Sequence, residues 1–504
     1  MVGRILSLTL LAIVVALSAC APASPTAAPP AQTAIPIATQ ARGAHPCPTE
    51  TGAPTPTETI EPSPVATPQP TSTPASLTPT PLPTIRASCY PDASAPLDDL
   101  VVLRGPEHQF DPSCEVSGGV GEITASWDID GDGTAESEEA DPPPLALQPG
   151  EYNPVVTFTD EAGQSLTVQL ARIVKVGPPR YPDWRYGVHA HIVLGEGPYA
   201  AQSSAEIERE LQLIEDAGIQ FVKLDFKWDF LEPDAGQYDF YNYDRLVQLV
   251  RERGLGIFAV VSFSPRWASS GSGDSWRDWV FDAPKNPRHY GRFFSALVDR
   301  YGDYIKVWEV WQEPNCSLYF RSADPEQYIA VLMQGYLSAK YADPTSIVGL
   351  GSLANYETSF PGVVFRPPEE FLQSIYDAGG KGHFDFVDRH PYPRFDQRDP
   401  TQVLDYLDST RTVMMVNGDE GIGMAVSEIG IPSFSTVSEG DVAASLPLIL
   451  DAILSRDYVW MVSWYNLRDK GADPDDPEHH FGLVRRDWSI KPAYVAYGEF
   501  IRSH

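Results

Sequence analysis

The stretch IERELQLIEDAGIQFVKLDF, residues 207–226, joins an amphipathic helical pattern to an apolar strand-like run. Its first part carries apolar residues at helical spacing and ends at Gly218, and glycine commonly caps helix C-termini. A second stretch, YDRLVQLVRERG at 243–254, ends at Gly254 in the same way. We therefore predict helices over 207–218 and 243–254 and a strand over 220–226.

This alternation of strand and helix continues to the C-terminus. Strand-like segments, each followed by a helical stretch, fall at 186–192, 220–226, 256–263, 305–311, 346–350, 384–390, 423–428 and 458–465. Eight such units favour an α/β fold of the (β/α)8 TIM barrel type over 180–504. The main rival is a doubly wound open sheet, which usually carries a glycine-rich phosphate turn after its first strand; the sequence has no such turn there.

The N-terminus is typical of an exported protein. A short basic start precedes an apolar run at 5–17, which is too short to span a bilayer comfortably, and LSAC at 17–20 closes it. The tetrapeptide resembles a bacterial lipobox, which implies a signal peptide over 1–20 and lipidation of Cys20. The alternative is an ordinary secretory signal with a chance cysteine.

Composition separates the next segments and limits the partners. Residues 21–86 are rich in Pro, Thr, Ala and Ser and cannot bury a core, so we predict a linker there. Lys+Arg 36 against Asp+Glu 68 gives a formal net charge of −32, which argues against nucleic acid as a partner and leaves the lipid anchor as the membrane contact. Among five cysteines, Cys89 and Cys114 could pair in an exported protein.

Residues 87–177 show short alternating runs that predict a smaller all-β sandwich. The segments WDIDGDGT and PGEYNPVVTFTDEAG resemble the PKD domain, which is immunoglobulin-like. Within them, one set of acids fits the spacing of a calcium loop: Asp128, Asp130, Asp132 and Glu139. Flanking helices are missing, so a structural Ca²⁺ site in a β-turn competes with a plain acidic turn.

Two segments place a glutamate at the end of an apolar run. They are WEVWQEPN at 308–315, with Glu313, and AVSEIG at 425–430, with Glu428. If both runs are strands of one barrel, two carboxylates meet at its carboxyl-terminal face. Glycoside hydrolysis needs such a pair, because one acid protonates the leaving oxygen while the other attacks the sugar.

These two segments resemble clan A glycoside hydrolases, especially families 39 and 5. The resemblance implies that Glu313 is the acid/base and Glu428 the nucleophile of a retaining reaction, with no cofactor for catalysis. Where the clan usually has asparagine before the acid/base, this chain has Gln312, whose longer side chain would shift the contact to the sugar 2-hydroxyl.

Further residues are assigned to substrate binding by the same resemblance. In DRHPYP at 388–393, Tyr392 would bond the nucleophile and His390 would line the −1 subsite. Trp464 would form an aromatic floor under the sugar, and Trp228 in WDFLEP would approach the substrate. Lys223 stands where family 5 members usually carry arginine.

Period-two alternation on 220–226 directs Lys223 and Asp225 into the barrel. By the same alternation Glu309 points inward, and we expect it to form an ion pair with Lys223. His189 and His191 invite a zinc interpretation. A catalytic zinc needs a third ligand, and no HExxH pattern occurs, so we assign His189 to substrate contact instead.

The sequence thus predicts a retaining glycoside hydrolase that cleaves β-linked poly- or oligosaccharides at the extracellular face of the membrane. A non-catalytic carbohydrate-binding surface lipoprotein on a degenerate barrel is the alternative, since Gln312 departs from the clan pattern. A structural adhesin built on the PKD-like domain is a third interpretation, and it requires the positions of Glu313 and Glu428 to be coincidental.

Overall fold

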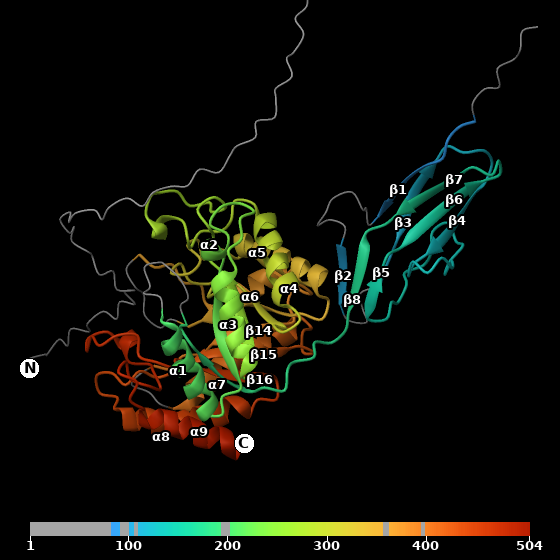
Figure 1. Cartoon of the computed structure of the whole chain (residues 1–504). Helices are drawn as coiled ribbons and strands as arrows, with labels where there is room; N and C mark the ends of the chain where they lie inside the picture. Colours follow the sequence, from blue (N-terminus) through green and yellow to red (C-terminus); the bar gives the residue numbers. More distant parts are fainter. Residues whose placement is uncertain (1–81, 91–99, 105–108, 193–201, 356–361, 395–398) are drawn as a thin grey trace, which may run out of the picture. The chain divides into compact units, whose positions relative to one another are not determined.

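The computed structural model describes residues 82–504 apart from 91–99, 105–108, 193–201, 356–361 and 395–398 (Figure 1). The predicted signal peptide, Cys20 and the linker up to residue 81 lie outside the described residues. None of the helices in the described ranges has the length and apolar character needed to cross a membrane.

Eight parallel strands form a closed barrel, in which each strand pairs with the next along the chain and the last pairs with the first. The strands are β9 (Tyr186–His189), β10 (Phe221–Lys227), β11 (Gly256–Ser262), β12 (Val307–Val310), β13 (Ile347–Ala354), β14 (Phe386–His390), β15 (Gly423–Ile429) and β16 (Val459–Tyr465). The predicted barrel is confirmed, and the open-sheet alternative is wrong.

Helices alternate with these strands and surround them (Figure 1). They are α1 (Ser204–Asp216), the short α2 (Trp228–Leu231), α3 (Tyr241–Glu252), α4 (Pro287–Tyr301), α5 (Pro325–Ala342), α6 (Pro368–Asp377), α7 (Pro400–Val416), α8 (Glu439–Leu454) and α9 (Pro492–Ser503). Gly218 and Gly254, after α1 and α3, have φ angles of 77° and 66°, as expected of glycines that end helices. Both predicted helices are confirmed.

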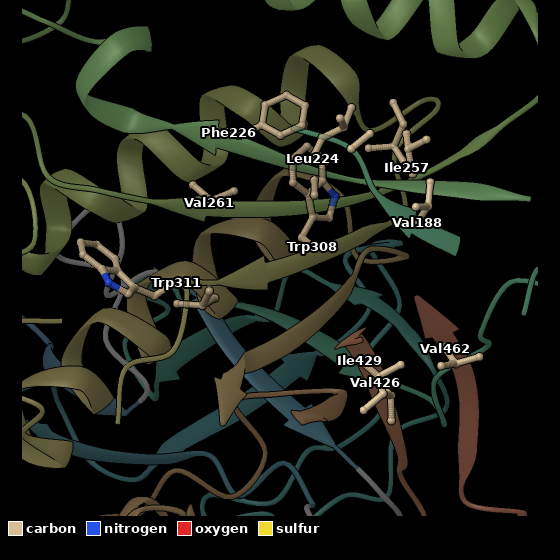
Figure 2. Close-up of a cluster of buried hydrophobic side chains, with 14 of the residues drawn as sticks. Val188, Leu224, Phe226, Ile257, Val261, Trp308, Trp311, Val426, Ile429 and Val462 are labelled. Carbon is tan, nitrogen blue, oxygen red and sulfur yellow. The ribbon is translucent and has the colours of Figure 1, made fainter. Parts of the chain in front are cut away.

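Alternation along the strands divides the barrel residues into two sets. Outward residues such as Leu224, Val261 and Trp308 pack in the large apolar core that includes the helices (Figure 2). Inward residues near the amino-terminal strand ends form a separate apolar plug: Phe221, Phe258, Val260, Val307, Ile347, Phe386, Ala425 and Met461. The next inward positions are polar, so the plug closes the barrel beneath a layer of buried charged and hydroxyl groups.

In the region before the barrel, the described residues form eight strands in three small sheets, ordered β1-β3, β2-β8-β5 and β4-β6-β7. The strands are β1 (Arg86–Tyr90), β2 (Leu100–Arg104), β3 (Ser113–Ser117), β4 (Ile123–Asp128), β5 (Gly150–Tyr152), β6 (Val155–Asp160), β7 (Ser165–Gln169) and β8 (Arg172–Val176). That this region is a PKD-like, immunoglobulin-like sandwich stays a prediction.

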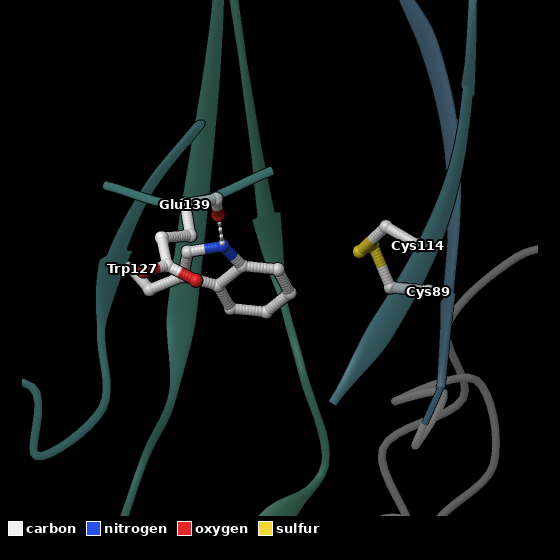
Figure 3. Close-up of a disulfide and its surroundings, with 4 residues drawn as sticks. All are labelled: Cys89, Cys114, Trp127 and Glu139. Atoms are coloured by element: carbon white, nitrogen blue, oxygen red, sulfur yellow. Dashed lines mark hydrogen bonds between the residues drawn. A yellow bond between two sulfur atoms is a disulfide. The ribbon is translucent and has the colours of Figure 1, made fainter. Parts of the chain in front are cut away.

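A disulfide joins β1 to β3 in this region, between Cys89 and Cys114 (Figure 3). This confirms the pairing that the sequence suggested. Nearby, the indole of Trp127 is fully buried and donates a hydrogen bond of 2.9 Å to the carbonyl of Glu139 (Figure 3). Cys316 in the barrel is a buried free thiol.

Candidate active site

Glu313 and Glu428 meet at the carboxyl-terminal face of the barrel. Glu313 follows β12, Glu428 lies near the end of β15, and their exposed fractions are 3% and 4%. One carboxylate oxygen of each lies within 4.8 Å of the other and of a ring nitrogen of His390. The two carboxylates that lie 115 positions apart in the sequence therefore belong to one buried site.

Irregular backbone directs both glutamates inward. Trp311 and Glu313 have φ angles of 73° and 40°, in the left-handed region that residues other than glycine rarely adopt and that is found often at functional sites. On β15, the register against β16 shifts between Val426 and Ile429, which both pack outward. The extra residue of such a bulge lets Ser427 and Glu428 both face the interior.

Four side chains hold the carboxylate of Glu428. Its Oε1 lies 2.9 Å from Nδ1 of His189, 2.9 Å from Nζ of Lys223 and 3.1 Å from Nε2 of Gln312. Its Oε2 accepts a hydrogen bond of 2.9 Å from the hydroxyl of Tyr392. Both oxygens are thus satisfied by donors from four different segments of the barrel.

The surroundings of Glu428 favour its ionised form. Burial raises the pKa of Glu428, but the charges of His390, Lys223 and His189 outweigh burial and hold that pKa well below its ordinary value. Burial lowers the pKa of His189, but Glu428 and Asp225 outweigh it, so the pKa of His189 is raised. The carboxylate of Glu428 and the ammonium of Lys223 thus stabilise each other's charged forms, because Glu428 also raises the pKa of Lys223.

Glu313 contacts the side chains of His390 and Ser352. Its Oε1 lies 2.7 Å from Nδ1 of His390, and its backbone N–H donates to Oγ of Ser352 over 3.2 Å. His390 is itself fully buried, so this contact is shielded from water. The same nitrogen of His390 lies 3.7 Å from Oε2 of Glu428, which places the imidazole between the two carboxylates.

The hydroxyl of Ser427 and the carboxylate of Asp388 form a buried network beside Glu313 and Glu428. Asp388 accepts hydrogen bonds from the backbone N–H of Ser427, at 2.9 Å, and from its hydroxyl. The hydroxyl oxygen of Ser427 accepts from Nζ of Lys223 at 2.9 Å and lies 3.0 Å from Nε2 of His390. Asp388 and Ser427 therefore connect the lysine beside Glu428 with the histidine beside Glu313.

The expected ion pair between Glu309 and Lys223 is wrong. Glu309 does face inward, but Lys223 pairs with Glu428, and Glu309 accepts a hydrogen bond from the backbone N–H of Ser352. Burial and the neighbouring charge of Asp388 raise the pKa of Glu309 well above its ordinary value. The raised pKa favours the neutral form of Glu309, because burial and a neighbouring carboxylate both disfavour its charge.

The structure brings most of the predicted site residues together. Alternation on β10 is confirmed, because Val222, Leu224 and Phe226 pack outward while Lys223 reaches the interior. The residues that surround the two carboxylates are Gln312, His390, Tyr392, Lys223 and His189. Their individual roles in substrate binding and catalysis stay predictions.

Trp464 does not form the floor of the site. Its side chain is fully buried and packs in the outer core with Val462, because both occupy outward positions of β16. The next residue, Tyr465, takes the inward position instead, and its ring centroid lies 5.4 Å from that of His189 and 6.0 Å from that of Tyr392. Sequence analysis missed Tyr465, although alternation from the inward Met461 could have identified it.

Trp228 also packs in the apolar core. It is fully buried in α2, where its ring stacks against Phe293 at 5.6 Å and its indole N–H donates to Glu232 at 2.6 Å. Its predicted substrate contact is therefore wrong, since packing and the hydrogen bond use the whole side chain.

The acidic turn after β4 has a different fourth member from the one predicted. Asp128, Asp130 and Asp132 offer ligand atoms within 4.8 Å of one another together with Glu136, whereas Glu139 contributes its backbone carbonyl to Trp127. Glu139 was predicted because the calcium-loop pattern places its last ligand at that spacing, whereas in this β-region Glu136 is the acid that lies beside the three aspartates. Calcium binding by the turn stays a prediction.

Comparisons with known proteins support the resemblance. Residues 178–423 match the family model described as glycosyl hydrolases family 39. A β-xylosidase of Geobacillus stearothermophilus is 24% identical over 298 residues, which cover 54% of this chain and 58% of that protein. The β-galactosidase Bga of Halorubrum lacusprofundi is 24% identical over 132 residues, which cover 22% of this chain and 19% of that protein.

The chain thus spans less than two thirds of the length of either curated relative. Among solved structures, a family 39 glycoside hydrolase from Bacteroides cellulosilyticus WH2 matches with a TM-score of 0.51 at 20% identity. That match covers 80% of this chain and 81% of the other, and it shows a shared fold.

Proposed function

We propose that the barrel, whose residues 178–423 match the family model described as glycosyl hydrolases family 39, is a retaining glycosidase with Glu428 as nucleophile and Glu313 as acid/base. The approach of their carboxylate oxygens to within 4.8 Å carries this proposal. Retaining enzymes keep the two carboxyl groups about 5–5.5 Å apart, whereas inverting enzymes need about 6.5–9.5 Å for a water molecule. Glu428 must therefore attack the anomeric carbon itself.

The residues around Glu428 keep the proposed nucleophile ionised and correctly oriented. The lowered pKa of Glu428 keeps it ionised, and the hydroxyl of Tyr392 and the amide of Gln312 fix the direction of its oxygens. Gln312 also accepts from Lys223 at 3.3 Å, so its amide is engaged at both ends. In this chain, Gln312 would therefore have two roles. It orients Glu428, and it lies where it could contact a hydroxyl of the bound sugar.

Glu313 then acts twice in the proposed reaction. In the first step it gives its proton to the leaving oxygen while Glu428 forms the glycosyl ester. In the second step it takes a proton from water, which attacks the anomeric carbon and releases Glu428. The contact of 2.7 Å with His390 holds the acid in place through both steps.

The substrate class follows from the relatives, which are named β-xylosidase and β-galactosidase. We infer a β-linked oligo- or polysaccharide as the substrate of this chain. Cleavage would take place outside the cell, with the protein anchored through Cys20 and carried on the linker. Changing Cys20 to Ser should release the protein from the membrane fraction.

Labelling with a mechanism-based 2-deoxy-2-fluoro-glycoside tests the proposal. Digestion and mass spectrometry should find the sugar on Glu428, and proton NMR of an aryl β-glycoside reaction should show a β-configured first product. Glu428→Gln should lower turnover by about 10⁴-fold or more. Glu313→Ala should slow substrates with poor leaving groups by about 10²–10⁴-fold and aryl glycosides with good leaving groups far less.

The carbohydrate-binding alternative gives a different result. Such a protein would bind glycans, and Glu428 would not be labelled. Its turnover would be no higher than that of the Glu428→Gln variant. Near-normal activity in both glutamate variants would overturn the assignment of the pair.

A further inference from the structure

Two histidines at the end of β9 and one aspartate of β10 form a second cluster beside the carboxylate pair. His189, His191 and Asp225 each offer one ligand atom within 4.8 Å of the others. Nε2 of His189 lies 3.9 Å from Oδ2 of Asp225, and the centroids of the two imidazole rings are 4.2 Å apart. Atoms bound to one zinc at about 2.0–2.2 Å lie up to about 4 Å from each other. The cluster is therefore close to the size that a single metal ion requires.

Two of the candidate ligand atoms lack a partner. Within the described part of the chain, Nε2 of His189 and Nε2 of His191 are buried and make no hydrogen bond. His189 as a whole is only 3% exposed. Buried polar atoms are nearly always satisfied, so two unsatisfied nitrogens in a cluster with one carboxylate indicate a missing ligand.

The second ring nitrogen of His189, Nδ1, contacts a carboxylate, as is usual for metal-binding histidines. Its Nδ1 lies 2.9 Å from Oε1 of Glu428, which is an acceptor when ionised. Metal-binding histidines usually donate their second ring N–H to a carboxylate, which fixes the tautomer and leaves the other nitrogen free for the metal. With Nδ1 donating to Glu428, a neutral His189 carries its lone pair on Nε2, the nitrogen that lies 3.9 Å from Oδ2 of Asp225.

A neighbouring cluster shows the contrast. Glu313, His390 and Glu428 also lie within 4.8 Å of one another, but there Nδ1 of His390 already contacts Glu313 at 2.7 Å. Near this group, Lys223 pairs with Glu428 at 2.9 Å and Lys470 pairs with Glu478 at 3.2 Å. Among the described groups of the two clusters, the buried nitrogens that make no hydrogen bond are therefore Nε2 of His189 and Nε2 of His191.

We propose that Nε2 of His189, Nε2 of His191 and the carboxylate of Asp225 form a binding site for a divalent transition metal ion of the zinc class. Two imidazoles and one carboxylate suit such ions and leave a position open for water. The inference concerns binding alone and goes beyond the proposed glycosidase activity, because it holds whether or not the barrel turns over a glycoside.

Calorimetric titration of the purified protein with Zn²⁺ tests the site, with Ca²⁺ in excess to fill the acidic turn at 128–136. We expect one Zn²⁺ per chain, and both His191→Ala and Asp225→Asn should weaken binding by about tenfold or more. Co²⁺ gives a second readout, since its visible absorption in a site of low coordination should be lost in the same variants. Asp225→Asn keeps the size of the side chain, so it decides the question if His191→Ala does not fold.

His504→Ala is the matched control. His504 forms an exposed pair with Asp451 at 3.2 Å, and its removal should leave the titration unchanged. Absence of zinc binding by the unmodified protein, or equal affinity in the unmodified protein and in both site variants, would overturn the proposal.

Discussion

Nζ of Lys223 lies 2.9 Å from Oε1 of Glu428, and the exposed fractions of the two side chains are 0% and 5%. A buried ion pair of this kind is a weak source of net stability, because desolvation of both charges opposes their attraction. Its consequence is electrostatic. Lys223 is one of the charges that hold the pKa of Glu428 well below its ordinary value, so the lysine keeps the proposed nucleophile ionised.

Replacing Lys223 by Met should therefore change the pH dependence of activity. Removal of the positive charge raises the pKa of Glu428, and activity is lost as the pH falls through that pKa. The acidic limb of kcat/KM should accordingly move to higher pH, by about 1–3 units. The measurement is kcat/KM on an aryl β-glycoside from pH 3 to pH 8.

Lys340→Met provides the control for this prediction. Lys340 is equally buried and pairs with Asp385 at 2.7 Å, on α5 and away from the site. Both variants should lose stability, since each leaves a buried carboxylate without its partner. An acidic limb that moves in neither variant would contradict the role assigned to Lys223.

Ser427→Ala should impair catalysis without removing any group that touches the sugar. The hydroxyl of Ser427 joins Asp388 to Lys223 and His390, so its loss frees the side chains that orient both glutamates. We expect kcat to fall by about 10–100-fold with little change in KM. Unfolding free energy should fall by about 1–3 kcal/mol, because Asp388 is left with an unmet hydrogen bond.

The matched comparison is Ser463→Ala on the neighbouring strand β16. Ser463 is also fully buried, but its hydroxyl has no hydrogen-bond partner within the described residues. Its removal should leave kcat and stability nearly unchanged. Equal losses in the two variants would show that the network through Ser427 has no special role.

Substitutions of Trp464 and Tyr465 on β16 should have different effects, one on stability and the other on substrate binding. Trp464→Leu should lower the unfolding free energy by about 3 kcal/mol or more, because it leaves a cavity in the outer core, while KM stays the same. Tyr465→Leu should raise KM instead, since Tyr465 occupies the inward position beside His189. Kinetics together with urea unfolding of both variants would check this, and the reverse pattern would restore Trp464 as the floor.

Glu210 on α1 should make stability depend on pH. Burial raises the pKa of Glu210 to about 7, despite the charge of Arg468 at 3.6 Å. A carboxyl whose folded pKa is raised stabilises the folded state below the unfolded pKa, and this contribution is lost as the pH rises through 4.5 to about 7. Glu210→Gln should thus match the unmodified protein at pH 4.5 and be about 1–3 kcal/mol more stable at pH 8.

Urea unfolding at the two pH values measures the difference for Glu210. Glu208→Gln on the same helix is the control, because Glu208 is only half-buried and pairs with Arg253. A stability difference for Glu210→Gln that is the same at both pH values would refute the assigned pKa.

The sequence determined the barrel and the two glutamates. Helical and strand periods are local properties of the chain, and eight alternating units leave few ways to bury their apolar faces. The inward direction of Lys223 followed from the same alternation. Tyr465 could also have been found this way, had the resemblance not drawn attention to Trp464.

Only the tertiary structure decided how the site is connected. The bulge at Ser427 and Glu428 breaks the alternation that sequence reasoning relies on, and the positive φ angles at Trp311 and Glu313 have no sequence signal. Lys223 had two inward carboxylates within reach, and the choice of Glu428 over Glu309 depends on distances across the barrel. Asp225 likewise became the third partner of His189 and His191 only when β9 and β10 paired, because ligand geometry depends on residues from different strands, whereas periodicity describes one strand at a time.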